Sequence, residues 1–268
     1  MARFDHTVTV ASLDRAWFEE CARLVLDTAE STRARGGDIV LGDAGPQVVG
    51  IRLLKGRHLR PGARYEITSD AGEADAAWAD GPSDDRIVTT VREWRRSTAI
   101  AVEQRMESAG LIARLAVRLR TPERPGALDV GFDVRDPTGG ALQRVSGRAK
   151  LDLTAWWAAA AARPGSLPPA RAPLAARARH RLGRARLTVT PRPAADGAWE
   201  VGVTLTVRGR SLLRPVAALA LFFGQVPVRR AFRSGVDRAA AGWNEALASA
   251  PLPAADELRA ELVKALTD

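Results

Sequence analysis

Cysteine and histidine are scarce in this chain of 268 residues, which holds one cysteine and three histidines. The single cysteine, Cys21, excludes an intramolecular disulfide and a cysteine-based zinc site. His6, His58 and His180 lie far apart, and no two of them have the close spacing of a metal site on a helix. We therefore expect no bound metal, and a reducing, cytoplasmic compartment.

Long apolar runs and the common cofactor motifs are also missing. The longest apolar run, 216–223, is too short to span a bilayer, and the N-terminal residues have an early acid and no apolar core region. The chain contains neither a glycine-rich nucleotide loop nor a Gly-x-Ser-x-Gly turn. These absences predict a soluble protein without a cofactor and argue against phosphoryl-transfer and hydrolase activity.

Basic residues are concentrated in the C-terminal part, where residues 161–268 hold 17 basic and 8 acidic side chains. The excess of arginine over lysine and the abundant alanine are typical of GC-rich, bacterial-type coding. Residues 161–183 combine arginines with prolines and predict a solvated basic connector. No aromatic residues alternate with these arginines, so we expect no specific nucleic-acid partner and at most a peripheral contact with an anionic membrane.

Alternation of apolar and polar residues predicts many short strands with short connections, and hence an antiparallel sheet. On one of them Leu115 and Val117 face one side while Arg114 and Arg118 face the other, so one side of the sheet should face water. The predicted strands are 3–10, 47–54, 63–69, 86–95, 98–106, 110–120, 127–135, 141–154, 184–192 and 199–208.

Helical periodicity predicts an early helix at 14–30 that Gly36 and Gly37 end, a short helix at 155–162 and a last helix at 254–266. A long closing helix follows the strand 199–208, with an interruption at Gly224 and Pro227. The expected buried stripe of the early helix is Trp17, Cys21, Leu24, Val25 and Thr28. That of the closing helix is Val228, Phe232, Val236, Ala239, Trp243 and Leu247.

Residues 184–247 contain a strand hairpin turning at Asp196-Gly197, the phrase Arg-Ser-Leu-Leu-Arg-Pro at 210–215, and an amphipathic helix. This ending resembles the helix-grip fold of the START-like or SRPBCC superfamily, which includes polyketide cyclases and lipid carriers. The resemblance implies an α+β fold with a curved antiparallel sheet wrapped on a long C-terminal helix, here enlarged by an insertion.

In this interpretation residues 1–160 form the sheet with the early helix. Residues 161–183 connect them to the closing hairpin and helices of 184–268, which continue the same fold. The stretches 18–23, 59–66 and 96–100 also resemble hotdog-fold acyl thioesterases, which implies a hotdog-like fold as the alternative. Many such enzymes carry an acid followed by a Gly-His-Val-type turn; Asp14 is the only acid in a similar place here, and no histidine follows it.

Three strands each carry one polar residue on an otherwise apolar face: His6, Tyr65 and Gln104. In a helix-grip protein these side chains would line a cavity between the sheet and the C-terminal helix, with Trp199 in its wall. The chain would then bind a hydrophobic small molecule, such as a lipid, acyl chain or polyketide. His6 and Tyr65 are the candidate catalytic residues of a cyclase or dehydratase, because both side chains can transfer protons. The sequence leaves open whether the protein is an enzyme.

Overall fold

The computed structural model describes residues 1–68, 86–108, 110–163, 167, 169–194, 197–209, 225–248 and 254–268. Three features expected from the sequence lie outside these residues in whole or in part: the turn at Asp196, the phrase at 210–215 and the interruption at Gly224. The chain divides into two compact units that interleave along the sequence. Unit 1 comprises 1–17, 126–129 and 144–252, and unit 2 comprises 18–125, 130–143 and 253–268.

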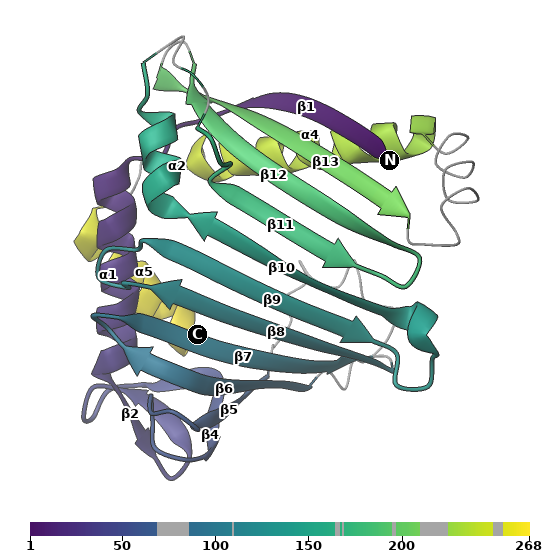
Figure 1. Cartoon of the computed structure of the whole chain (residues 1–268). Helices are drawn as coiled ribbons and strands as arrows, with labels where there is room; N and C mark the ends of the chain where they lie inside the picture. Colours follow the sequence, from purple (N-terminus) through teal and green to yellow (C-terminus); the bar gives the residue numbers. More distant parts are fainter. Residues whose placement is uncertain are drawn as a thin grey trace. The chain divides into compact units, whose positions relative to one another are not determined.

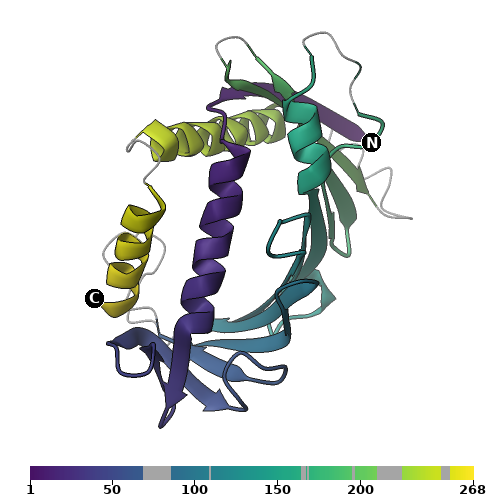
Figure 2. The same ribbon diagram turned by 90° about the vertical axis from the view of Figure 1, so that its left-hand side faces the viewer.

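Unit 1 is built on an antiparallel sheet in which the first strand lies next to the last (Figure 1). The strand order is β1-β13-β12-β11-β10. Helix α4 (Gln225–Ala248) packs along β1, and helix α2 (Leu153–Ala160) packs on β10 and β12 (Figures 1 and 2). The strands are β1 (Ala2–Val10), β10 (Arg144–Asp152), β11 (Leu174–Arg179), β12 (Gly183–Pro193) and β13 (Trp199–Gly209).

Unit 2 contains an antiparallel meander in which neighbours in the chain are neighbours in the sheet. Helix α5 (Ala255–Thr267) packs on β4, and helix α1 (Arg15–Ser31) belongs to this unit from Phe18 onward. Strand β9 (Ala127–Arg135) has residues in both units, and a short 3-10 helix, η2 (Ala141–Gln143), follows it. The other strands are β2 (Thr32–Arg35), β3 (Asp38–Leu41), β4 (Gln47–Lys55), β5 (Arg64–Ile67), β6 (Arg86–Arg95), β7 (Ala99–Ser108) and β8 (Leu111–Arg120).

The α+β class, the antiparallel strands and the C-terminal helix expected from the sequence are confirmed. Strand β11 lies within the residues expected to form a connector, 161–183, and the unit borders do not fall at 160 or 183. The early helix expected at 14–30 is found at Arg15–Ser31, but the expectation that Gly36 and Gly37 end it was wrong. Helix α1 ends at Ser31, and Gly36 and Gly37, with φ of 60° and 101°, form the turn between β2 and β3. Only the conformational freedom of glycine suits such a turn well.

The buried side of each long helix matches the expected stripe at most positions, and where it differs the buried residue is the next one in the chain. In α1 the buried residues are Leu24, Leu26 and Thr28, whereas Val25 is 51% exposed. In α4 the partly buried row is Val228, Phe232, Val236, Ala240, Asn244 and Leu247. Trp243, expected in that row, is 39% exposed. The row reaches Asn244 at intervals of four residues, and the Asn244 amide oxygen accepts the Ala11 N–H just beyond the end of β1. The more exposed Trp243 also contacts Ala11, because its indole N–H donates to the Ala11 carbonyl at 2.9 Å.

Pro227 lies in the first turn of α4. Backbone N–H groups in the first turn have no acceptor within the helix, so a proline there costs no helical hydrogen bond. It therefore marks the beginning of the helix and does not divide its described part. No helix in the described part of the chain has both the length and the apolar character needed to cross a membrane.

Candidate functional site

Two of the four predicted site residues lie in one row across the sheet of unit 2. Tyr65 on β5 pairs with Thr89 on β6, and Thr89 pairs with Gln104 on β7. Directly paired residues of antiparallel strands project from the same face of a sheet. Tyr65, Thr89 and Gln104 therefore form a continuous polar row, which Leu115 on β8 continues. Thr89, the central member, was not among the residues selected from the sequence.

Apolar rows flank this polar row on both sides. Val91, Val102 and Val117 form one of them. The other consists of Ile67, Ile87, Met106 and Ala113. Tyr65 and Val91 are buried, but the remaining members of the three rows are all partly exposed. The described protein atoms thus leave much of this face, which we call the apolar face of unit 2, incompletely covered.

The hydroxyl of Thr89 is buried and has no hydrogen-bond partner in the described part of the chain. Within the same residues the amide of Gln104 on the next strand also makes no hydrogen bond. A buried polar group without a partner costs on the order of 1–3 kcal/mol of folding free energy. The centre of the apolar face therefore carries two polar side chains whose hydrogen-bonding capacity is not used within the described protein.

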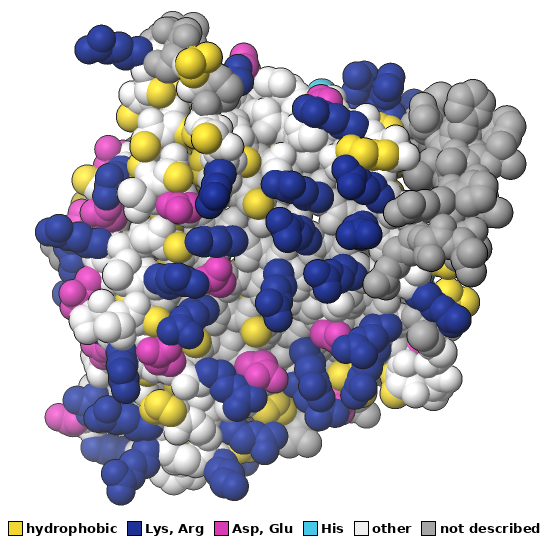
Figure 3. Space-filling view, in the orientation of Figure 1, with side chains coloured by type: hydrophobic (Ala, Val, Ile, Leu, Met, Phe, Trp, Pro, Cys, Tyr) yellow, Lys and Arg dark blue, Asp and Glu magenta, His cyan; other side chains and the backbone are white. Residues whose placement is uncertain are grey.

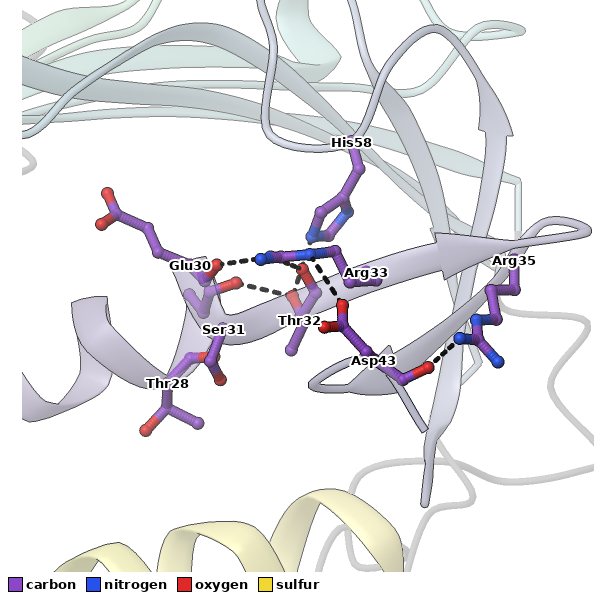
Figure 4. Close-up of polar contacts among 9 residues, drawn as sticks. Thr28, Glu30, Ser31, Thr32, Arg33, Arg35, Asp43 and His58 are labelled. Atoms are coloured by element: carbon purple, nitrogen blue, oxygen red, sulfur yellow. Dashed lines mark hydrogen bonds and ion pairs between the residues drawn. The ribbon is translucent and has the colours of Figure 1, made fainter. Parts of the chain in front are cut away.

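Tyr65 differs from its two neighbours because its phenol group is fully engaged. The Tyr65 oxygen accepts the Leu59 backbone N–H at 2.7 Å and lies 3.0 Å from Nδ1 of His58. Nε2 of His58 lies 2.8 Å from the Thr32 hydroxyl, which in turn donates to the Ala29 carbonyl at 2.6 Å. Figure 4 shows His58 above the end of α1, with Thr32 beneath its ring.

These contacts allow one consistent arrangement of protons. Because the Thr32 hydroxyl donates to a carbonyl, it accepts from Nε2–H of His58, and Nδ1 then accepts the Tyr65 O–H. This is the neutral form of the imidazole. Burial, and secondarily the charge of Arg33, lowers the pKa of His58, while burial raises the pKa of Tyr65. Both shifts favour neutral side chains, so Tyr65 is a positioned hydrogen-bond donor and not an activated acid.

His6 and Trp199 belong to unit 1. His6 is partly buried on β1, where Nε2 lies 2.6 Å from the Asp237 carboxylate on α4. Nearby on the same two elements, the rings of Phe4 and Phe232 are 6.3 Å apart. The Asn244 amide accepts the Ala11 N–H at 2.7 Å. His6 is thus one of several contacts that hold α4 against β1.

A hollow of about 700 Å³ adjoins this contact on α4. Asp237, the partner of His6, lies in its wall together with Arg229, Arg230, Arg233 and Arg238. The wall is therefore strongly basic. Trp199, in contrast, is buried, and its ring lies 6.0 Å and 5.7 Å from the rings of Trp156 and Trp157 on α2. It packs in the core between the sheet and α2.

Among the described residues, no cluster of three or more His, Cys, Asp or Glu side chains is placed to hold a metal ion. Comparisons of the chain with protein-family models, with curated proteins and with solved structures found no match. Thr89 could have been found from the sequence, because it interrupts the apolar positions Ile87 and Val91 in the same way that Gln104 interrupts Val102 and Met106. The hydrogen bonds of His58 carry no such signal.

Proposed function

We propose that the chain binds a hydrophobic small molecule, such as a lipid, an acyl chain or a polyketide, on the apolar face of unit 2. The observation that carries the proposal is the buried Thr89 hydroxyl without a described partner, within rows of incompletely covered apolar side chains. An apolar ligand would cover these side chains, gaining about 25 cal/mol for each Å² of apolar surface removed from water. A polar group on the ligand would at the same time satisfy Thr89 and Gln104.

The chemistry of the face narrows the class of ligand. The three rows contain threonine, glutamine and tyrosine but no charged side chain. The arginines and glutamates of these strands, such as Arg92 and Glu103, lie on the opposite face, where these two pair at 2.6 Å. A buried carboxylate without a cation would be costly here. We therefore expect a neutral polar group, such as a hydroxyl, ketone or ester, on the bound molecule.

The topology of unit 1 supports the helix-grip interpretation over the hotdog alternative. The first strand, β1, pairs along its length with the last strand, β13, and the C-terminal helix α4 packs on β1. A C-terminal helix held against the sheet is what the START-like resemblance implies. The described residues also include more strands than a single helix-grip domain requires, in keeping with an enlarged sheet.

Ligand binding can be tested by native mass spectrometry of the purified protein and by titration with a fluorescent fatty-acid ester. Thr89→Val and Gln104→Leu should each weaken binding about tenfold, because each removes a hydrogen bond to the polar group of the ligand. Thr90→Val is the matched control, since Thr90 follows Thr89 in the strand and faces the other side. Equal affinities in Thr89→Val and Thr90→Val would contradict the proposed site.

An enzyme on the same scaffold, a cyclase or dehydratase, is the second candidate. It is favoured by the 2.6 Å contact between His6 and Asp237, since a carboxylate that orients an imidazole is a common arrangement in general acid–base catalysis. The substrate of such an enzyme would lie at the hollow beside Asp237 in unit 1 and not on the apolar face of unit 2. Incubation with a polyketide-type substrate would then change the mass or the ultraviolet spectrum of the molecule bound there. His6→Gln should stop this change while leaving affinity within about tenfold, roughly 1.4 kcal/mol. A ligand recovered unchanged from the parent protein would favour simple binding.

A further inference from the structure

Arginines on neighbouring strands of unit 1 face one another directly. Arg148 on β10 pairs with Arg177 on β11, which pairs with Arg186 on β12. The next row on the same face contains Arg179, Arg184 on β12 and Arg208 on β13. Two of these arginines, Arg177 and Arg179, were expected in a solvated connector, but both are paired in strand β11 of the sheet. The six guanidinium groups therefore extend from a fixed lattice, which we call the arginine rows.

All six side chains are exposed, and within the described residues none of them forms an ion pair or a hydrogen bond through its side chain. Basic side chains gather over β10, β11 and β12 in Figure 3. The acidic residues on the strands of this sheet have other partners or lie farther along the strands from the arginine rows. Asp5 binds Arg3 and Thr204, Asp152 caps α2, and Glu200 lies opposite Arg192. Like charges placed directly opposite one another destabilise a sheet, so the rows lower the stability of the protein alone.

An exposed apolar residue stands at the end of the rows. The hairpin between β11 and β12 is closed by backbone hydrogen bonds between His180 and Gly183, and Leu182 at its tip is 47% exposed. The paired residues Arg179 and Arg184 lie immediately before and after this tip. Binding at a membrane surface combines the burial of apolar side chains at the boundary between headgroups and acyl chains with the attraction of basic side chains to anionic lipids, and Leu182 beside the arginines provides both kinds of group.

We propose that the arginine rows and Leu182 dock on the surface of an anionic lipid membrane. Strands about 4.8 Å apart, with alternate residues about 7 Å apart along each strand, spread the charges over a two-dimensional surface. This distribution suits a plane of anionic headgroups, and each basic side chain near such a surface favours binding. The outward residues next to the rows on β10 to β13 are Ser146, Lys150, Ala175, Thr188, Thr204 and Thr206, and none of them is an aromatic residue on which a nucleic-acid base could stack. The proposal is independent of the ligand site, which lies in unit 2.

Flotation of the full chain with lipid vesicles tests the proposal. The protein should float with vesicles of phosphatidylcholine and phosphatidylglycerol but not with vesicles of phosphatidylcholine alone. Replacing Arg177, Arg179, Arg184 and Arg186 by Gln should lower the partition coefficient by about tenfold or more. Leu182→Ser should leave binding at low salt nearly unchanged and weaken it at physiological salt, where screening reduces the electrostatic part.

The matched control replaces four exposed arginines of unit 2, Arg60, Arg64, Arg95 and Arg124, by Gln, so that the net charge changes equally. Full vesicle binding by this control, with loss in the other variant, supports docking through the rows. An equal loss in both variants shows a mere effect of net charge and overturns the proposal. Absence of vesicle binding by the parent also overturns it. So does retention on double-stranded DNA at physiological salt without vesicle binding, which would identify a nucleic-acid surface. Thermal melting of both variants without lipid verifies that each is folded.

Discussion

Thr89→Val tests the central observation about unit 2 with the smallest possible change. Valine has nearly the shape of threonine and exchanges only the hydroxyl for a methyl group. In the described structure that hydroxyl is buried and has no partner, between Tyr65 and Gln104 in the polar row. The substitution therefore removes a destabilising group from the protein without ligand, and a hydrogen-bonding group from the complex.

The two effects have opposite signs. An unsatisfied buried hydroxyl costs on the order of 1–3 kcal/mol, so Thr89→Val should raise the free energy of unfolding without ligand by about 1 kcal/mol, since part of the cost is already relieved by relaxation. For a protein of this size a change of about 1 kcal/mol corresponds to roughly 2–4 °C in the melting temperature. Ligand affinity should fall about tenfold, which is about 1.4 kcal/mol.

Urea unfolding of delipidated protein and titration with the fluorescent ester measure the two quantities separately. The control, Thr90→Val, changes a threonine on the outward face and should alter the unfolding free energy by less than about 0.5 kcal/mol. Our reasoning would be refuted by a Thr89→Val variant that is less stable than the parent and binds the ester equally well. That result would mean that the Thr89 hydroxyl has a protein partner, such as a rotated Gln104 amide, and serves only the fold.

Three further measurements follow from the contacts described above. Burial lowers the pKa of His58 from 6.5, so the unfolded chain takes up a proton at a higher pH than the folded chain, and the free energy of unfolding should decline below about pH 6.5. His58→Gln should remove this part of the decline in urea titrations at several pH values. Tyr65→Phe leaves the Leu59 N–H and the His58 ring without their partner, and calorimetry should show a loss of about 1–2 kcal/mol. Asn244→Ala frees the Ala11 N–H and should speed amide hydrogen exchange in α4, whereas the exposed Arg233→Gln should not.

Most strands could be predicted from the sequence because their side chains alternate strictly. The strands 86–95 and 127–135 have the predicted bounds. The strands that were missed, β2, β3 and β11, have only four to six residues each, too few for alternation to stand out. In β11 the sequence Ala-Arg-Ala-Arg does alternate, but the prolines before it and the small alanine side chains favoured a connector. Its pairing with β10 and β12, which are themselves clear strands, determines its structure.

The candidate site could be predicted only residue by residue. Alternation identified Tyr65 and Gln104 as polar groups on apolar faces, but the register between strands is set by pairing along the whole sheet. That register places Thr89 between them. It also places Arg177 opposite both Arg148 and Arg186, which no local pattern in the sequence indicates. For His6 the sequence predicted the apolar face correctly but gave no indication of Asp237, which is 231 residues away.

The sign of the stability change separates the polar residues of this chain into two groups. Tyr65 and Asn244 have partners, so their removal should destabilise the protein. Thr89 lacks one in the described structure, and the arginines of the rows face like charges, so their removal should leave the protein equally stable or make it more stable. Groups that lower the stability of a fold are typical of surfaces that bind something else. Thermal melting of the four-arginine variant without lipid measures this directly, and a lower melting temperature than the parent would show that the arginine rows serve the fold and not a partner.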